Sequence, residues 1–228
     1  MQYTFQFGPL IAYLPQFLSG LWLTMQLSIV GIFGGFALGV GLAIVSTLSW
    51  FLPRFLVRCY VEIVRNTPLL VQIFVIFFGL PNIGIRMSPL TSVTIALVFN
   101  NAGYIAEIVR GGIQSTHRSQ FEAAESLGMT YLQTLRFVIL PPALERVFTP
   151  VVSQCVLLML STSLVSAVGV EDMTGAAMIA SSETFRTMEV YLVIAAVYVT
   201  LNFIFWALLN LLGLIVFRRS RRKLLGRI

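Results

Sequence analysis

The sequence is poor in the residues that most enzymes use for catalysis and metal binding. It contains one histidine, His117, and one lysine, Lys223, which lies in an arginine-rich run near the C-terminus. A phosphate-binding loop requires the pattern Gly-x-x-x-x-Gly-Lys-Ser/Thr, and this sequence lacks it. A lone histidine also argues against a histidine-based metal site and a Ser-His-Asp triad. We therefore expect no catalytic residues, no metal ligands and no cofactor bound by this chain.

Charge of either sign is scarce as well. Charged residues make up 11% of the chain and hydrophobic residues 57%, whereas soluble domains carry about a quarter charged residues. Five stretches have no charge: residues 1–53, 66–85, 87–106, 147–170 and 190–217. Each can hold the roughly 20 apolar residues of a membrane-spanning helix. We predict an all-α membrane protein, a single domain of residues 1–228, with five spans near residues 20–46, 58–80, 88–110, 144–168 and 190–217.

The few positive charges predict the orientation of these spans. If the N-terminus lies outside, only Arg86 and Arg186 of the 15 lysines and arginines fall on the outer side. Cytoplasmic loops carry the excess of lysine and arginine, so we predict an outer N-terminus and a cytoplasmic C-terminus. The net charge of +6 then reflects orientation, and we expect no nucleic-acid partner. The basic tail after residue 217 is expected to contact membrane lipid.

Residues 114–136, here called the inner segment, join the third and fourth spans and are polar yet helical in pattern. Ser119 and Glu122 have the spacing of a capping box, and Gly128 suits the left-handed position after a helix. Thr130 can cap a second helix, which Pro141 and the following Pro142 would end. Two short helices on the inner side suit docking to another protein or, alternatively, lying on the lipid surface.

The inner segment also carries the residues of a known motif. The elements Glu122-Ala123-Ala124, Gly128, Val138, Leu140 and Pro141 have the spacing of the EAA loop, with Val138 in place of isoleucine. The chain thus resembles the permeases of binding-protein-dependent ABC importers. The stretches at residues 65–72 (RNTPLLVQ) and 104–113 (YIAEIVRGGI) and the triplet Thr162-Ser163-Leu164 are similar to those of the polar amino acid subfamily.

The resemblance implies a type I ABC importer permease fold in the bacterial cytoplasmic (inner) membrane. In that family two permease subunits form the pathway and work by alternating access. Two cytoplasmic ATP-binding subunits use ATP and Mg, and an extracytoplasmic substrate-binding protein delivers the substrate. The residues that would couple this chain to the ATPase are Gln120, Glu122, Ala123, Ala124 and Gly128.

Polar side chains inside the predicted spans are candidates for the substrate pathway, because lipid offers them no partner. The candidates are Gln72, Asn101, Tyr104, Glu107, Ser161, Thr162 and Ser163. Hydrogen bonding between helices is the alternative explanation for this set. Ion pairing at the inner interface is likewise an alternative for Glu62 with Arg65 and for Glu107 with Arg110.

One departure from the family pattern affects the expected partner and substrate. The lysine that commonly stands two residues before Thr-Ser-Leu is Leu160 here. We therefore expect a heterodimer with a second permease that keeps the lysine, and a basic or zwitterionic amino acid as substrate. A secondary transporter or channel for small polar solutes is the alternative class, for which Glu107 would be the coupling residue.

Overall fold

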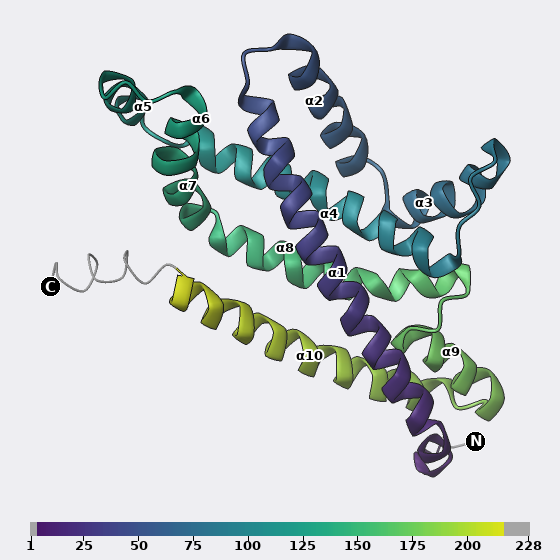
Figure 1. Ribbon diagram of the computed structural model, residues 1–228. Helices are drawn as coiled ribbons and strands as arrows, with labels where there is room; N and C mark the ends of the chain where they lie inside the picture. Colours follow the sequence, from purple (N-terminus) through teal and green to yellow (C-terminus); the bar gives the residue numbers. More distant parts are fainter. Residues whose placement is uncertain (1–3, 217–228) are drawn as a thin grey trace, which may run out of the picture.

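The computed structural model describes residues 4–216, and every regular element in that range is a helix (Figure 1). The α-helices are α1 Leu14–Thr47, α2 Phe51–Arg65, α3 Leu69–Phe74, α4 Pro89–Gln114, α5 Arg118–Ser126, α6 Tyr131–Gln133, α7 Leu140–Arg146, α8 Phe148–Ser161, α9 Met173–Thr184 and α10 Thr187–Val216. Shorter 3-10 or π-helical pieces are η1 Gly8–Tyr13, η2 Val75–Gly79, η3 Leu80–Ile83, η4 Thr134–Ile139 and η5 Thr162–Val168. The predicted all-α class is confirmed for the described residues.

Four helical stretches are long and apolar enough to cross a membrane. They are Gly8–Thr47, Pro89–Gln114, Phe148–Val168 and Thr187–Val216, and they overlap four of the five predicted spans. The remaining prediction, residues 58–80, is not one straight helix, because α2 and α3 meet at an angle of 109°. The described residues therefore hold four spans, or five if this bent pair counts as one. The predicted last residue of the fifth span, 217, lies outside them.

The break between α2 and α3 follows from Pro68, which disfavours helical geometry in the residue before it. Breaking a helix exposes backbone carbonyls that lipid cannot satisfy. The side chain of Gln72 meets this need: its Nε2 donates to the carbonyl oxygens of Val64 at 2.9 Å and Thr67 at 3.1 Å. Gln72 therefore stabilises the bend between α2 and α3.

The centre of the molecule is the contact between α1 and α4, which cross in the middle of Figure 1. Glycines on α1 allow the two backbones to approach closely. A Cβ added to Gly35 would lie 2.6 Å from the Cβ of Asn101, and one added to Gly39 would lie 2.7 Å from the Cβ of Ile105. Larger residues at these two positions would force the helices apart.

One helix was not predicted from the sequence. The short α9 packs against both α1 and α10, at the end of the molecule where the N-terminus lies (Figure 1). Asp172 caps it, accepting a hydrogen bond from Gly175 N at 2.9 Å. The carboxyl group is fully buried, and burial raises the pKa of Asp172 to about 6. Glu183 also lies here and accepts a hydrogen bond from Tyr13 at 2.7 Å.

Candidate functional site

The first helix of the inner segment, α5, presents its polar face to solvent. Gln120, Glu122 and Ala123 are exposed, whereas Ala124 is buried. The predicted capping box of Ser119 and Glu122 is wrong. The helix begins two residues earlier, so His117 is its N-cap and accepts from Ser119 N at 3.3 Å. Glu122 instead pairs with Arg118, 3.1 Å away on the same helix.

The second helix of this region starts as predicted but does not end as predicted. Gly128 has φ +72°, the left-handed conformation expected after α5. Thr130 caps α6 and forms a capping box with Gln133. Pro141 does not end the helix, because α6 continues through the π-helical piece η4 into α7, with the prolines in the first turn of α7. The wider π turns accommodate a ring that lacks a backbone N–H.

Two contacts tie this region to the long helices. Tyr131 donates from its hydroxyl to the carbonyl oxygen of Thr47, the last residue of α1, at 2.9 Å. Arg146 on α7 donates to the carbonyl oxygen of Ser115 at 2.8 Å and to Thr116 Oγ1 at 3.2 Å, just after α4. These hydrogen bonds join the inner helices directly to the ends of α1 and α4.

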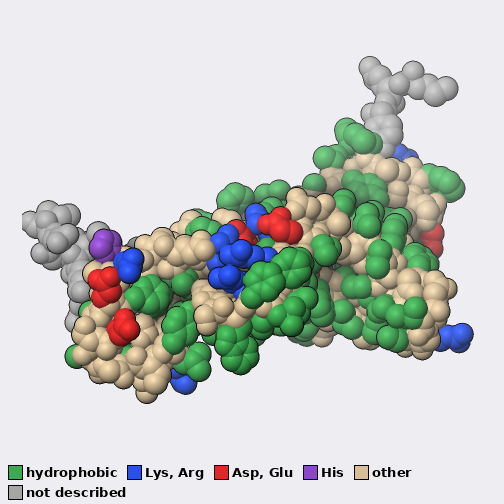
Figure 2. All heavy atoms as spheres, turned by 90° about the horizontal axis from the view of Figure 1, so that it is seen from above, with side chains coloured by type: hydrophobic (Ala, Val, Ile, Leu, Met, Phe, Trp, Pro, Cys, Tyr) green, Lys and Arg blue, Asp and Glu red, His purple; other side chains and the backbone are tan. Residues whose placement is uncertain are grey.

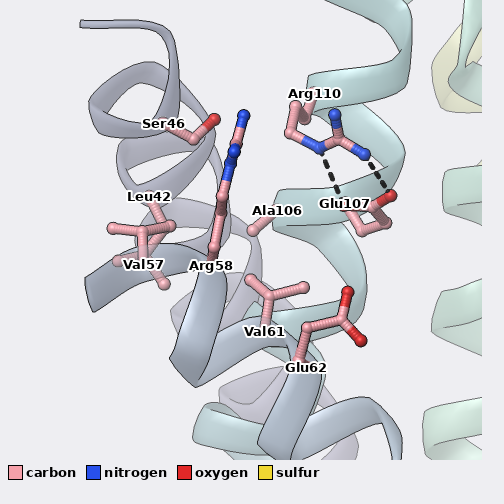
Figure 3. Close-up of a pocket in the computed structure, with 9 residues that line it drawn as sticks. All are labelled: Leu42, Ser46, Val57, Arg58, Val61, Glu62, Ala106, Glu107 and Arg110. Carbon is pink, nitrogen blue, oxygen red and sulfur yellow. Dashed lines mark hydrogen bonds and ion pairs between the residues drawn. The ribbon is translucent and has the colours of Figure 1, made fainter. Parts of the chain in front are cut away.

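A cavity of about 250 Å³ opens between α1, α2 and α4 (Figure 3). It is called the charged cavity below. Its lining consists of Leu42, Ser46, Val57, Arg58, Val61, Glu62, Ala106, Glu107 and Arg110. In Figure 3 the Arg58 side chain extends from α2 between Ser46 on α1 and Arg110 on α4. Two guanidinium groups and two carboxylates therefore surround one small space.

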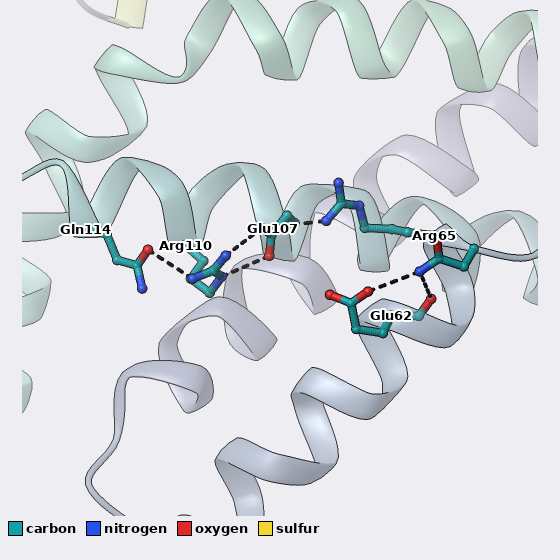
Figure 4. A network of polar contacts seen from close by, with 6 residues as sticks. Glu62, Arg65, Glu107, Arg110 and Gln114 are labelled. Carbon is teal, nitrogen blue, oxygen red and sulfur yellow. Dashed lines mark hydrogen bonds and ion pairs between the residues drawn. The ribbon is translucent and has the colours of Figure 1, made fainter.

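Glu107 is the centre of a polar network beside this cavity (Figure 4). Arg110 donates from Nε to Glu107 Oε2 at 2.8 Å and from Nη2 to Oε1 at 2.5 Å. Arg65 Nη1 on α2 lies 3.6 Å from Glu107 Oε1. The expected pairing of Glu107 with Arg110 is therefore present. The expected pairing of Glu62 with Arg65 is not, because Glu62 accepts from Asn66 at 3.0 Å instead.

Charged groups of both signs gather on the side of the molecule where α2 lies uppermost in Figure 1. Figure 2, seen from that side, shows basic and acidic atoms near the middle of the face, among hydrophobic side chains. Ionisable residues in spanning segments face a water-filled cavity or a protein neighbour, because exposing them to lipid is costly. Exposing this face to the hydrocarbon of a bilayer would therefore be costly.

The other predicted pathway residues do not form one group. Gln72 accepts from Asn100 at 3.1 Å, linking α3 to α4. Asn101 is fully buried and faces α1 and α8, where its Nδ2 donates to the carbonyl oxygen of Gly31 at 3.1 Å and its Oδ1 accepts from Gln154 at 3.4 Å. In this conformation Asn101 thus joins α1, α4 and α8. Tyr104 is half-buried on α4.

The hydroxyl groups of Ser161, Thr162 and Ser163 are satisfied within their own helix. They donate to the carbonyl oxygens of Leu157, Met159 and Leu160 at 2.7, 2.7 and 2.8 Å. Thr162 is fully buried, and the other two are half-buried. The α-helix also changes here to the 3-10 helix η5. These residues therefore mark a local change of backbone geometry and not a cluster of free polar groups.

Arg58 and Glu62 line the charged cavity but were not predicted as site residues. A signal for them was present. Arg54, Arg58, Glu62 and Arg65 recur at helical spacing, which places them on one face of α2. A charged face on a helix between two apolar spans indicates a surface that faces water or a partner.

The apolar helices are those of a membrane-spanning protein, and the family match assigns it to a transporter. Residues 35–218 match the model of the binding-protein-dependent transport system inner membrane component, and the chain belongs to this family. The predicted resemblance to ABC importer permeases is thereby confirmed, and the alternative of a secondary transporter or channel is not supported. Members of this family are not themselves ATPases; they work with separate ATPase subunits and a substrate-binding protein.

The relatives agree with this assignment. The chain is 36% identical over 186 residues to the probable glutamine ABC transporter permease protein GlnM of Bacillus subtilis, covering 82% of this chain and 86% of that protein. It is 30% identical over 193 residues to the glutamine transport system permease protein GlnP of Escherichia coli K12, covering 84% and 88%. It is 37% identical over 207 residues to the octopine transport system permease protein OccM of Rhizobium radiobacter, covering 86% and 83%.

Solved structures share the fold. A crystal structure of an amino acid ABC transporter with histidines superimposes with a TM-score of 0.84 at 34% identity, covering 92% of this chain and 99% of that one. An inward-facing structure of the MetNI methionine ABC transporter gives a TM-score of 0.75 at 21% identity, covering 92% and 98%. The fold is thus that of ABC importer permeases.

Proposed function

We propose that this chain is one of the two permease subunits of an ATP-driven importer that moves polar amino acids across the bacterial cytoplasmic membrane by alternating access. The observation that carries the proposal is the charged cavity beside Glu107, on a face whose exposure to lipid would be costly. Pairing this face with a second permease would enclose a polar path between two apolar subunits. The names of the relatives, which include glutamine and octopine permeases, support the substrate class.

The proposed orientation has the N-terminus outside and the C-terminus in the cytoplasm. It is supported by Arg54, Arg58 and Arg118, which the positive-inside rule assigns to the cytoplasmic side. In this orientation α9 and the N-terminus lie outside, where the substrate-binding protein would dock. The inner segment lies in the cytoplasm, within reach of the ATPase.

The proposed coupling element is α5. Its exposed residues Gln120, Glu122 and Ala123 would contact a cleft of one of two cytoplasmic ATP-binding subunits, which use ATP and Mg. Gly128 would set the angle to the next helix. This chain binds no cofactor in the proposal. The contacts of Tyr131 with Thr47 and of Arg146 with Ser115 support transmission of the ATPase movement to the spans.

The proposed pathway keeps the predicted residues Gln72, Asn101, Tyr104, Glu107, Ser161, Thr162 and Ser163 as candidates. Their support differs. Glu107 lines a cavity, whereas Asn101 and the three hydroxyl residues are satisfied by helix contacts. These latter residues would reach substrate only if the helices separate during transport.

For the substrate we favour an amino acid with a neutral polar side chain over a basic one. Glu107 is the carboxylate with which a basic side chain could pair, but Arg65 and Arg110 already neutralise it. The charged cavity offers both signs of charge, which suits the ammonium and carboxylate groups of a zwitterion.

The second permease is proposed to be a different chain. Neither Leu160 nor Ser161 supplies a positive charge in the segment where the family commonly has a lysine. A partner that keeps the lysine would make one asymmetric site. A transport-competent complex that contains two copies of this chain and no other permease would contradict the heterodimer.

The experiment that tests the function is purification of the complex from its native membrane, followed by reconstitution with the substrate-binding protein. ATP hydrolysis is then measured with a panel of amino acids. We expect stimulation by a neutral polar amino acid, and Glu122→Ala with Gly128→Leu should separate hydrolysis from uptake. Uptake that proceeds normally without the ATPase subunits, or in this double variant, would refute the proposed coupling.

A further inference from the structure

The C-terminus of α2 is capped by side chains that follow it in the sequence. The last carbonyl groups of a helix have no partner within that helix, and those of α2 lie at the break before α3. Thr67 Oγ1 donates to the carbonyl oxygen of Ile63 at 2.8 Å. Gln72 Nε2 donates to the next one, that of Val64, at 2.9 Å. This second cap comes from beyond the bend, because Gln72 lies on α3.

The amide group of Gln72 joins three helices. Its Nε2 also donates to the carbonyl oxygen and the hydroxyl oxygen of Thr67, at 3.1 and 2.9 Å. Its Oε1 accepts from Nδ2 of Asn100 on α4 at 3.1 Å, and Asn100 is buried. Both the nitrogen and the oxygen of this amide therefore have partners within the chain. Helices α2, α3 and α4 are tied together at one point beside the bend.

One face of α4 contacts both sides of the bend. Asn100, Gly103 and Glu107 lie at helical positions i, i+3 and i+7, which share a face. The first of them binds α3, as described above. A Cβ added to Gly103 would lie 2.7 Å from Val64 Cγ1, so α2 packs closely on α4 here. Glu107 lies 3.6 Å from Arg65 of α2 (Figure 4). The angle of α2 at the bend therefore sets the distance between Arg65 and Glu107.

The shape of the charged cavity depends on the same angle. Pro68 at the break has no backbone N–H, so no continuous helix fixes the direction of α2 relative to α3. Arg58 and Glu62 line the cavity from α2. The backbone of Arg58 lies about 9 Å along the helix from Val64. A rotation of about 10° at the bend would move it by about 1.6 Å, which is enough to break a hydrogen bond.

We propose that Gln72 and Asn100 form a positioning clamp, which fixes the angle of α2 against α4 and thereby the shape of the charged cavity. The clamp acts through the contact of Arg65 with Glu107, and neither of its two side chains contacts the transported solute. Binding of solute by Gln72 would uncap a carbonyl of α2, which lipid cannot satisfy. The inference rests on the proposed function in one respect, namely that the charged cavity takes part in transport.

The first test measures the approach of α2 to α4 by oxidative cross-linking of the intact importer complex in lipid vesicles. Cys59→Ser and Cys155→Ala first remove the two native thiols. The reporter pair is Val64→Cys with Gly103→Cys, because a Cβ on Gly103 would lie 3.1 Å from Val64 Cβ. The two Cβ atoms of a disulfide are about 3.8 Å apart, so this pair is expected to cross-link readily.

A control pair reports the contact of α1 with α4 in the same way. It is Gly31→Cys with Leu97→Cys, for which the corresponding distance is 3.4 Å. Gln72→Leu removes the clamp and should slow the α2–α4 cross-link about fivefold without changing the control pair. Gln154→Leu is the matched variant, since it removes a buried glutamine amide that binds Asn101 on α4. It should leave the α2–α4 cross-link unchanged.

The second test asks whether the clamp acts through Arg65. Gln72→Leu and Arg65→Gln should each lower uptake about threefold, and the double variant should lower it no further, because both disturb the same contact. A loss of about ninefold in the double variant, as expected for independent effects, overturns this link. A slower α2–α4 cross-link together with normal uptake in Arg65→Gln would support the clamp and refute the proposed role of the charged cavity in transport.

Three results of the cross-linking would overturn the clamp. An unchanged α2–α4 cross-link in Gln72→Leu shows that the amide does not hold α2. Equal slowing of the α2–α4 and α1–α4 pairs gives Gln72 a role in overall stability alone. Unchanged cross-linking with an altered ratio of the amino acids taken up makes Gln72 a contact of the solute instead.

Discussion

Helices α4 and α10 both qualify as membrane spans, yet they occupy opposite environments. In the most apolar 18-residue stretch of α4, 61% of the residues are buried, against 6% in α10. Helix α10 is nevertheless the more hydrophobic of the two. Its few buried residues are Glu189, Val190, Ile194 and Gly213, whereas α4 buries polar residues such as Asn100 and Asn101.

The comparison shows that apolarity and burial are separate properties in a membrane. Lipid tails are as apolar as a protein interior, so burying a leucine side chain between helices brings no hydrophobic gain. Small and polar residues mark the helix contacts instead, because glycine permits close packing and an asparagine in lipid lacks partners. For example, Asn101 of α4 packs against Gly35 of α1 and donates a hydrogen bond to the carbonyl oxygen of Gly31.

The strongest test of this difference is to enlarge a glycine where α1 meets α4. A Cβ on Gly39 would meet Ile105 at 2.7 Å, whereas one on Gly41 would meet nothing within 4 Å. We expect Gly39→Leu to destabilise the protein by about 3 kcal/mol and Gly41→Leu to have little effect. Thermal unfolding of the purified complex measures both. Equal unfolding temperatures for the two variants would show that the α1–α4 contact is not tightly packed.

A second test removes apolar volume from each helix. Leu97 on α4 is fully buried, and Leu211 on α10 is 54% exposed. Leu97→Ala should cost about 2 kcal/mol through lost packing contacts and a cavity, while Leu211→Ala should cost less than about 0.5 kcal/mol. Chemical denaturation in detergent compares them. If Leu211→Ala were the more harmful, α10 would have to be packed against another subunit.

The same physics explains which parts of the fold could be predicted from the sequence. Charge-free stretches reveal spans because charges are excluded from lipid. Four of the five predicted spans overlap helical stretches long and apolar enough to cross a membrane. The bend at Pro68 was visible as a proline but was missed, because average apolarity does not register a change of direction. Helix α9 was missed because its place depends on the cap by Asp172 and on packing against α1 and α10.

The candidate site was predictable only in part. Motif spacing located α5 and Gly128, but the helix start depends on the local competition between His117 and Ser119 for the cap. Glu107 was recognised because it is an acid inside a predicted span. Arg58 and Glu62 were not, because Arg58 was taken to report topology and Glu62 to form an ion pair with Arg65 at the inner interface. Which side of α4 each polar residue faces, as for Asn100 and Asn101, follows from tertiary packing.

A third test concerns the charges that α4 carries and the central part of α10 lacks. Glu107→Gln leaves Arg110 and Arg65 without their carboxylate. Glu62→Gln keeps an oxygen that can accept from Asn66 and removes a charge that acts on Arg110 only from a distance. Because the network is partly exposed, we expect a loss of about 1 kcal/mol for Glu107→Gln and less for Glu62→Gln. Uptake by reconstituted complexes should fall several-fold in Glu107→Gln. If uptake fell only in Glu62→Gln, the carboxylate important for transport would be Glu62 on α2 and not Glu107 on α4.

The smallest expected effect lies where α9 joins α1 to α10. Burial raises the pKa of Asp172 to about 6, above the value near 4 of an unfolded chain. The folded state therefore disfavours the charged carboxylate, and this penalty is complete above pH 6 and disappears below pH 4. Asp172→Asn keeps a side chain that can cap α9 and removes the charge.

We expect Asp172→Asn to be at least as stable as the wild type at pH 8 and to lose this advantage as the pH falls toward 4. The hydroxyl group of Tyr198, 3.4 Å from Asp172 Oδ2, can donate to either side chain and so does not reverse the sign. Asp172→Ala removes the cap as well and should be about 1 kcal/mol less stable than Asp172→Asn at any pH. Unfolding temperatures across pH 4.5–8 separate the two effects. A wild-type protein that becomes steadily more stable than Asp172→Asn as the pH rises would mean that the carboxylate is stabilised by a positive charge in the assembled importer.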